Sequence, residues 1–117
     1  MTALTTYKSK ATTDRAAVLR YLKGLGEMGW TPVRYHDGEE SFKLVAGRSH
    51  DKIADDLMAT DAATLYLTKG INGEARRASI YFVFGNDPWE IAADSSYYDE
   101  WNADLKLVEE AINLEGL

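Results

Sequence analysis

The sequence predicts an α+β protein: an antiparallel sheet of about five strands with three helices, in the order α-β-β-α-β-β-β-α. Residues 78–84 form an apolar, β-branched and aromatic run that is typical of a central strand. Asn72-Gly73 precedes this run and is a strong hairpin signal, because both residues tolerate positive φ. Apolar side chains from Trp101 to Ile112 recur at helical spacing. We expect the helices to gather mainly on one face of the sheet.

The Asn72-Gly73 turn fixes the register of the strands on either side of it. In this register Leu67 lies opposite Ala78, and Leu65 lies opposite Ile80. Because side chains alternate between the two faces of a sheet, one face becomes uniformly apolar and is expected to be the core face. Its members are Ala63, Leu65, Leu67, Ala78, Ile80, Phe82 and Phe84.

A tight turn after Phe84 predicts a third strand, over residues 89–94. Three of its side chains are expected to join the core: Trp89, Ile91 and Ala93. Two carboxylates are expected to point away from it: Glu90 and Asp94. Hydroxyl and carboxylate groups in residues 95–100 then suit the start of a helix. The apolar stripe of that helix is Trp101, Leu105, Val108 and Ile112, and Gly116 is a suitable stop.

The N-terminal half predicts a helix, a hairpin and a second helix. Residues 1–11 are polar and are expected to be a loosely attached lead-in, so the single domain spans 12–117. The first helix is capped near Thr13 and ends near Gly29. Asp37-Gly38 predicts a hairpin in which Val33 pairs with Phe42 and Thr31 with Leu44. Ser49 can cap a helix that runs to about Thr60.

Charge and composition narrow the classes of function. The net charge is -6, and residues 61–117 hold four basic against eleven acidic side chains. This acidity argues against direct binding of nucleic acid, which depends on Lys and Arg neutralising phosphates. The chain has no cysteine, so a thiolate metal site or a cysteine nucleophile is excluded. No apolar run has membrane-spanning length, and a cytoplasmic protein with no membrane partner is expected.

The motifs do not predict an enzyme, a cofactor or a metal site. Ser49-His50-Asp51 has the residue types of a hydrolase triad, but adjacent residues cannot orient one another as a triad does. A helix cap is the better interpretation. His36 lies beside a turn and is interpreted as a surface histidine. Tyr66 and Tyr81 on the outer sheet face resemble a base-stacking platform, with Arg77 and Lys69 nearby, but structural pairing or a protein contact is favoured.

The acidic C-terminal region has two interpretations. It is either a solvated helix face that maintains solubility, or a surface complementary to a basic groove on a protein partner. Under the second interpretation, carboxylates occupy sites meant for phosphates while tyrosines provide the desolvated contacts. The partner-binding residues are then Glu90, Asp94, Tyr97, Tyr98, Asp99, Glu100 and Asp104.

The segment from Tyr81 to Asp94, in which an apolar strand and a Gly-Asn turn lead to a strand ending in Asp, resembles small uncharacterised accessory proteins of bacteriophages and plasmids. The resemblance implies a setting, since such proteins are often inhibitors of host defence of the anti-CRISPR or anti-restriction type. It suggests a non-enzymatic inhibitor that docks on a nucleic-acid-binding defence complex. An alternative is a ligand-binding or enzymatic α+β domain with a pocket between sheet and helices. Homodimerisation stays open.

Overall fold

The computed structural model describes residues 13–85 and 91–116. The elements are α2 (Asp14–Glu27), β1 (Thr31–His36), β2 (Ser41–Lys43), α3 (His50–Leu57), β3 (Ala62–Ile71), β4 (Glu74–Val83), β5 (Ala92–Ser95) and α4 (Asp99–Gly116). Within the described residues, the predicted α+β class and the order of three helices and five antiparallel strands are confirmed. The expected lead-in, Trp89 and Glu90 lie outside these residues.

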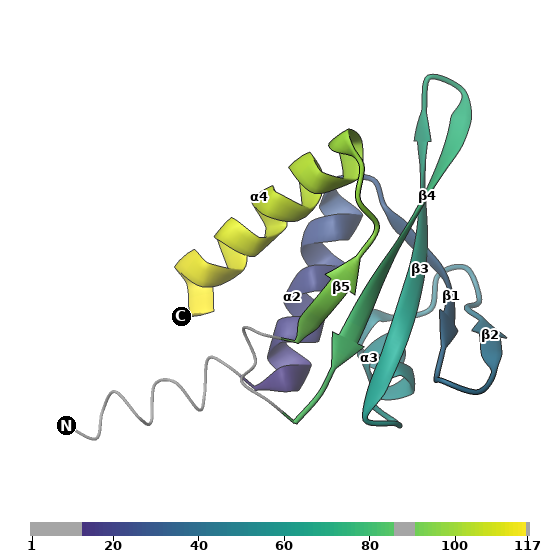
Figure 1. Cartoon of the computed structure of the whole chain (residues 1–117), viewed down its shortest axis with the longest axis vertical. Helices are drawn as coiled ribbons and strands as arrows, with labels where there is room; N and C mark the ends of the chain where they lie inside the picture. The colour runs from purple at the N-terminus through teal and green to yellow at the C-terminus, as the bar shows by residue number, and fades with distance from the viewer. Residues whose placement is uncertain (1–12, 86–90, 117) are drawn as a thin grey trace.

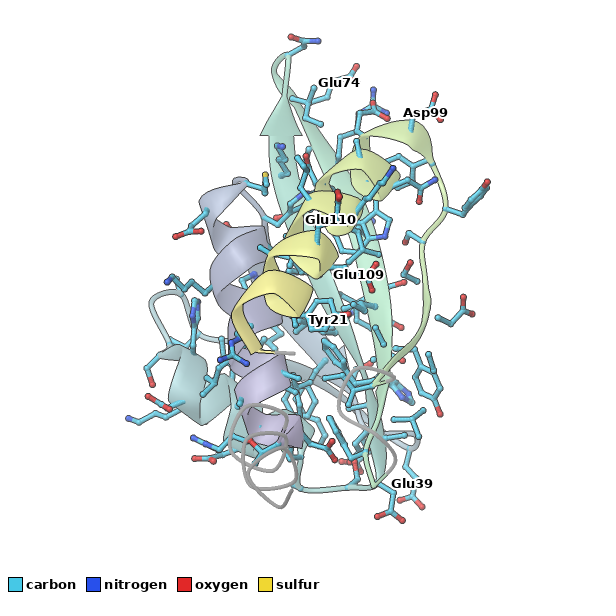
Figure 2. The ribbon with its side chains drawn as sticks, turned by 90° about the vertical axis from the view of Figure 1, so that its left-hand side faces the viewer. Tyr21, Glu39, Glu74, Asp99, Glu109 and Glu110 are labelled. Carbon is cyan, nitrogen blue, oxygen red and sulfur yellow. The ribbon has the colours of Figure 1, made fainter. Side chains whose placement is uncertain are left out.

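The fold has two layers. The sheet has the order β2-β1-β3-β4-β5, and each neighbouring pair is antiparallel. Helices α2 and α4 lie on one side of it (Figure 1), and Figure 2, which looks onto that side, shows these two helices in front of the strands. The largest fully buried side chains come from both layers: Trp30, Trp101, Phe82, Leu22, Leu25, Leu57, Leu65, Leu67, Ile80, Ile91 and Val18. No helix in the described ranges is long and apolar enough to cross a membrane.

The long β3–β4 hairpin has the predicted register, with Leu67 opposite Ala78 and Leu65 opposite Ile80. Both turn residues have positive φ, 53° at Asn72 and 81° at Gly73. This is the backbone that a two-residue turn needs to match the twist of its strands. The core-facing residues of both strands are buried, whereas Phe84 is only partly buried against the core.

The predicted register of the first hairpin is wrong by two residues, since Phe42 pairs with Tyr35 instead of Val33. The turn is longer than two residues. The Asp37 carboxylate accepts hydrogen bonds from the amides of Glu39 and Glu40, each at 2.9 Å, and the Asp37 amide donates to the Glu40 carbonyl at 3.0 Å. Asp37 therefore stabilises a wider turn with its side chain, and the strands shift accordingly.

Two irregularities of the sheet move residues away from the core. On β1 the register shifts between Pro32 and Arg34, so Val33 is an extra residue and is 36% exposed. On β4 and β5 it shifts between Tyr81 and Phe82, which leaves Ala93 exposed. The prediction that Ala93 joins the core is wrong for this reason, because a bulge interrupts the alternation of side chains. Ile91 is fully buried as expected.

The helix caps match the sequence. Thr13 Oγ1 accepts from the Ala16 amide at 3.1 Å, and Ser49 Oγ accepts from the Lys52 amide at 3.3 Å. Helix α3 ends at Leu57, earlier than the predicted end near Thr60. The Thr60 hydroxyl donates to the Ala62 carbonyl at 2.9 Å, in the turn that leads into β3.

Helices α2 and α4 pack against each other at Gly24. A Cβ atom on Gly24 would lie 2.8 Å from one Cγ of Val108 and 3.0 Å from the other. Val108 belongs to the predicted stripe of α4, in which Trp101 and Ile112 are buried and Leu105 is partly buried. The absence of a side chain on Gly24 thus sets how closely the two helices approach.

Candidate functional site

Four of the predicted partner-binding residues follow one another along the chain, from the end of β5 to the first turn of α4. Asp94, Tyr97, Asp99 and Glu100 are all exposed. Tyr97 is 88% exposed, more than any other large hydrophobic residue that the structure describes. We call these four residues the acidic surface. Glu90, the remaining carboxylate predicted before them, lies outside the described residues.

Tyr98 holds this segment against the sheet. Its hydroxyl donates to the Arg77 carbonyl of β4 at 2.7 Å, and its side chain packs against the core. Burial, followed by the nearby Glu100 carboxylate, raises the pKa of Tyr98. The side chain therefore stays a neutral hydrogen-bond donor. Tyr98 therefore fixes the backbone from which the neighbouring Tyr97 projects into solvent, and its own side chain is not part of the exposed acidic surface.

Asp104 stabilises the fold and is not exposed with the others. Its Oδ2 atom accepts from Trp30 Nε1 at 2.9 Å and from Lys69 Nζ at 2.8 Å. The side chains of Lys69 and Asp104 are only 24% and 17% exposed. Lys69 also lies 5.8 Å from the centre of the Trp30 ring, and Trp30 packs edge-on to Trp101 at 5.0 Å. This cluster joins α4 to the sheet, and the charge of the Asp104 carboxylate is already paired with Lys69.

A groove runs between β5 and α4 beside the acidic surface. Its volume is about 420 Å³, and it is lined by Ala92, Ala93, Asp94, Ser95, Ser96, Tyr97, Asn102, Leu105 and Glu109. Glu109 at its edge accepts from the Tyr21 hydroxyl of α2 at 2.8 Å, and Figure 2 shows these two side chains in the middle of the helix layer. The groove provides a recess next to an exposed aromatic ring.

Among the described residues, the acidic surface forms one ion pair, and its geometry is weak. Glu100 Oε1 lies 3.7 Å from Arg76, and the two side chains are 42% and 44% exposed. Solvent-exposed pairs of this kind contribute about 0–1 kcal/mol. Asp94 and Asp99 have no ion pair with any residue in the described ranges. The carboxylates are consequently available to an outside cation.

The open face of the sheet carries a second groove, with a volume of about 370 Å³. Its lining is Val33, Arg34, Lys43, Tyr66, Leu67, Thr68, Arg77 and Ala78. Tyr66 and Arg77 are on the predicted outer face. Lys69 is not, since it points to the helix side and pairs with Asp104. The sequence does not connect Arg34 and Lys43 with Tyr66, because it does not reveal that β1 lies between β2 and β3.

The catalytic and metal-binding candidates have structural roles. Ser49 Oγ is used as the cap of α3, and His36 Nδ1 accepts from the Gly38 amide at 2.9 Å within the hairpin turn. Among the described residues there is no group of three or more His, Cys, Asp or Glu side chains placed to hold a metal ion. In the structure Ser49 thus acts as a helix cap and His36 stabilises the hairpin turn.

Comparison of the chain with protein-family models, with characterised proteins and with solved structures finds no match.

Proposed function

We propose that this α+β protein is a non-enzymatic binding protein that docks on a basic surface of another protein through the acidic surface. The observation that carries the proposal is the nearly complete exposure of Tyr97, at 88%, between carboxylates that have no strong internal partner. An aromatic ring in this position exposes much apolar surface to water in the free protein. Burying it in a partner's pocket would be favourable, and tyrosine is enriched at the energetic centres of interfaces.

The surrounding charges define the partner. Asp94, Asp99 and Glu100 give the site a negative potential, so a basic surface is attracted to it and the rate of association is raised at low salt. The groove between β5 and α4 can accept a side chain from the partner beside Tyr97. The fixed backbone at Tyr98 lowers the cost of ordering the site on binding.

The proposal extends to the kind of partner. Surfaces that bind phosphates are rich in Lys and Arg, and clustered carboxylates can occupy them. We propose that the protein inhibits a nucleic-acid-binding bacterial defence complex of the CRISPR or restriction type, as a product of a phage or mobile element. The support is the acidic C-terminal region together with the resemblance of residues 81–94 to accessory proteins of such elements.

Matched variants test the acidic surface. Asp99→Asn/Glu100→Gln removes two negative charges from it, and Glu39→Gln/Glu40→Gln removes two from exposed positions in the first hairpin. Figure 2 shows Glu39 at the opposite end of the molecule from Asp99. A bait of each variant is incubated with nuclease-treated lysate from bacteria that carry defence systems. We expect one stoichiometric protein to be retained by the wild type and the Glu39/Glu40 variant, and reduced at least tenfold on the Asp99/Glu100 variant.

Tyr97→Ala supplies an independent test, since it changes no charge. Loss of the exposed ring should release the same partner, as removal of a central aromatic residue typically costs at least about 2 kcal/mol of binding. Retention of the partner by both the Asp99/Glu100 variant and Tyr97→Ala would exclude the acidic surface as the docking site.

A further inference from the structure

The groove on the open sheet face concentrates positive charge in a protein that is acidic overall. Arg34, Lys43 and Arg77 line it, and all three side chains are exposed. None of them forms an ion pair with a carboxylate in the part of the chain that the structure describes. Cations without counter-charges on one face favour an anionic occupant.

Three basic side chains away from this face are instead paired with carboxylates. Arg15 pairs with Asp51 and Asp55, Arg48 with Asp56 at 2.7 Å, and Lys69 with Asp104 at 2.8 Å. Among the described strand residues whose register places them on the open face, Asp94 is the only carboxylate. It lies opposite Tyr81, four residues along β4 from Arg77. The acidity that argues against phosphate binding is thus largely absent from this groove.

The three cations are spread across the sheet by its register. Lys43 on β2 pairs with Arg34 on β1, Arg34 pairs with Tyr66 on β3, and Arg77 on β4 lies opposite Thr68. At about 4.8 Å between neighbouring strands, the step from β2 to β4 covers roughly 14 Å. This span exceeds a single phosphate group and suits a chain of phosphates crossing the strands.

An aromatic platform lies between the cations. The guanidinium carbon of Arg34 is 4.6 Å from the centre of the Tyr66 ring, so the two flat groups are stacked in the free protein. Tyr81, 39% exposed, is on the same face further along β4. Flat arginine and tyrosine groups on an open sheet are surfaces on which unpaired bases stack.

We propose that this groove binds a segment of single-stranded nucleic acid. Its phosphates contact Lys43, Arg34 and Arg77, and a base stacks on the outer face of the Arg34 guanidinium, which itself lies over the Tyr66 ring. The exposed Val33, displaced outward by the bulge, adds an apolar wall beside that base. None of the residues that line this groove belongs to the acidic surface, so the proposal does not rest on the proposed protein-docking function.

Fluorescence anisotropy tests this directly, with a labelled oligothymidine of about ten nucleotides, within the ~4–16 that comparable sheet surfaces contact. We expect binding whose log affinity falls with log salt at a slope of about -2, since each phosphate contact to a single strand contributes about -0.7. Arg34→Gln/Arg77→Gln should reduce the slope to about -0.7. The matched control Lys52→Gln/Lys106→Gln removes two exposed positive charges from α3 and α4 and should leave the slope near -2.

Tyr66→Leu separates base stacking from charge, and we expect it to weaken binding at least about fivefold. Circular dichroism of each variant confirms that the fold is kept. Three results would overturn the proposal: no binding at low salt, equal losses in the Arg34/Arg77 and Lys52/Lys106 variants, or unchanged binding by Tyr66→Leu. Equal affinity for a labelled polyglutamate peptide would assign the groove to an acidic polypeptide instead, and equal affinity for thymidine monophosphate would assign it to a small ligand.

Discussion

Alanine substitutions at two glycines of α2 should change stability in opposite directions. A Cβ at position 24 would lie 2.8 Å from a methyl group of Val108, whereas at position 26 it would meet nothing within 4 Å. Both residues belong to the same helix, Asp14–Glu27. Gly26→Ala should therefore stabilise the protein, and Gly24→Ala should not.

The magnitude follows from two terms. Replacing glycine by alanine in a helix contributes up to about 1 kcal/mol, and this term is shared by both variants. Adding a methyl group to a packed contact costs about 1–3 kcal/mol. Val108 cannot rotate away easily, because it is 2% exposed and β-branched residues in helices have one strongly preferred rotamer. Gly24→Ala should thus be about 1–3 kcal/mol less stable than Gly26→Ala.

Urea unfolding followed by circular dichroism measures these differences. A double-mutant cycle with Val108→Ala isolates the contact, since the smaller side chain leaves room for a methyl group on residue 24. We expect a coupling of at least about 1 kcal/mol between Gly24→Ala and Val108→Ala, and none between Gly26→Ala and Val108→Ala. Equal stability of the two alanine variants, or additive effects at position 24, would refute this account of the α2–α4 contact.

Two further predictions concern polar groups at the junction of the helices. Asp104→Ala should cost about 2–4 kcal/mol of unfolding free energy, because it leaves Trp30 Nε1 and Lys69 without their acceptor. Asp104→Asn should cost less. A loss below about 0.5 kcal/mol for Asp104→Ala would show that the cluster does not stabilise the fold. Burial, followed by the Glu109 carboxylate, raises the pKa of Tyr21 above its ordinary value of 10.0. The neutral Tyr21 hydroxyl therefore contributes fully to the free energy of unfolding below pH 10, and this contribution is lost as the pH rises. Between pH 10 and 11 the wild type should lose about 1 kcal/mol more stability than Tyr21→Phe in urea titrations, and identical losses would contradict the assignment.

The two hairpins show how far local sequence determines the sheet. At Asn72-Gly73 both residues adopt positive φ, and the predicted register is confirmed. At Asp37-Gly38 only the glycine does, with φ of 105°, because the Asp37 carboxylate bonds to the amides that follow. The same type of dipeptide thus gives two different turns. Side-chain hydrogen bonding within the turn decides between them, and a dipeptide pattern does not report it.

The candidate site likewise has residues whose role local sequence predicts and residues whose role depends on contacts between distant segments. Exposure of Tyr97, Asp99 and Glu100 follows from their place in a polar helix start, which the sequence shows. The internal use of Asp104 depends on how α4 is rotated over Lys69, and this is a consequence of packing between distant segments. The groove on the open face also depends on strand order, since it joins Arg34 on β1 to Tyr66 on β3. Long-range contacts of this kind leave no local pattern.

The proposed docking function is tested most directly by quantitative mass spectrometry of proteins retained from nuclease-treated bacterial lysate on three baits. These are the wild type, Asp99→Asn/Glu100→Gln and Glu39→Gln/Glu40→Gln. We predict that one nucleic-acid-binding complex is retained in stoichiometric amount by the first and third baits and is at least tenfold depleted on the second. Equal retention on all three baits, or no protein specific to the wild type, would contradict docking through the acidic surface.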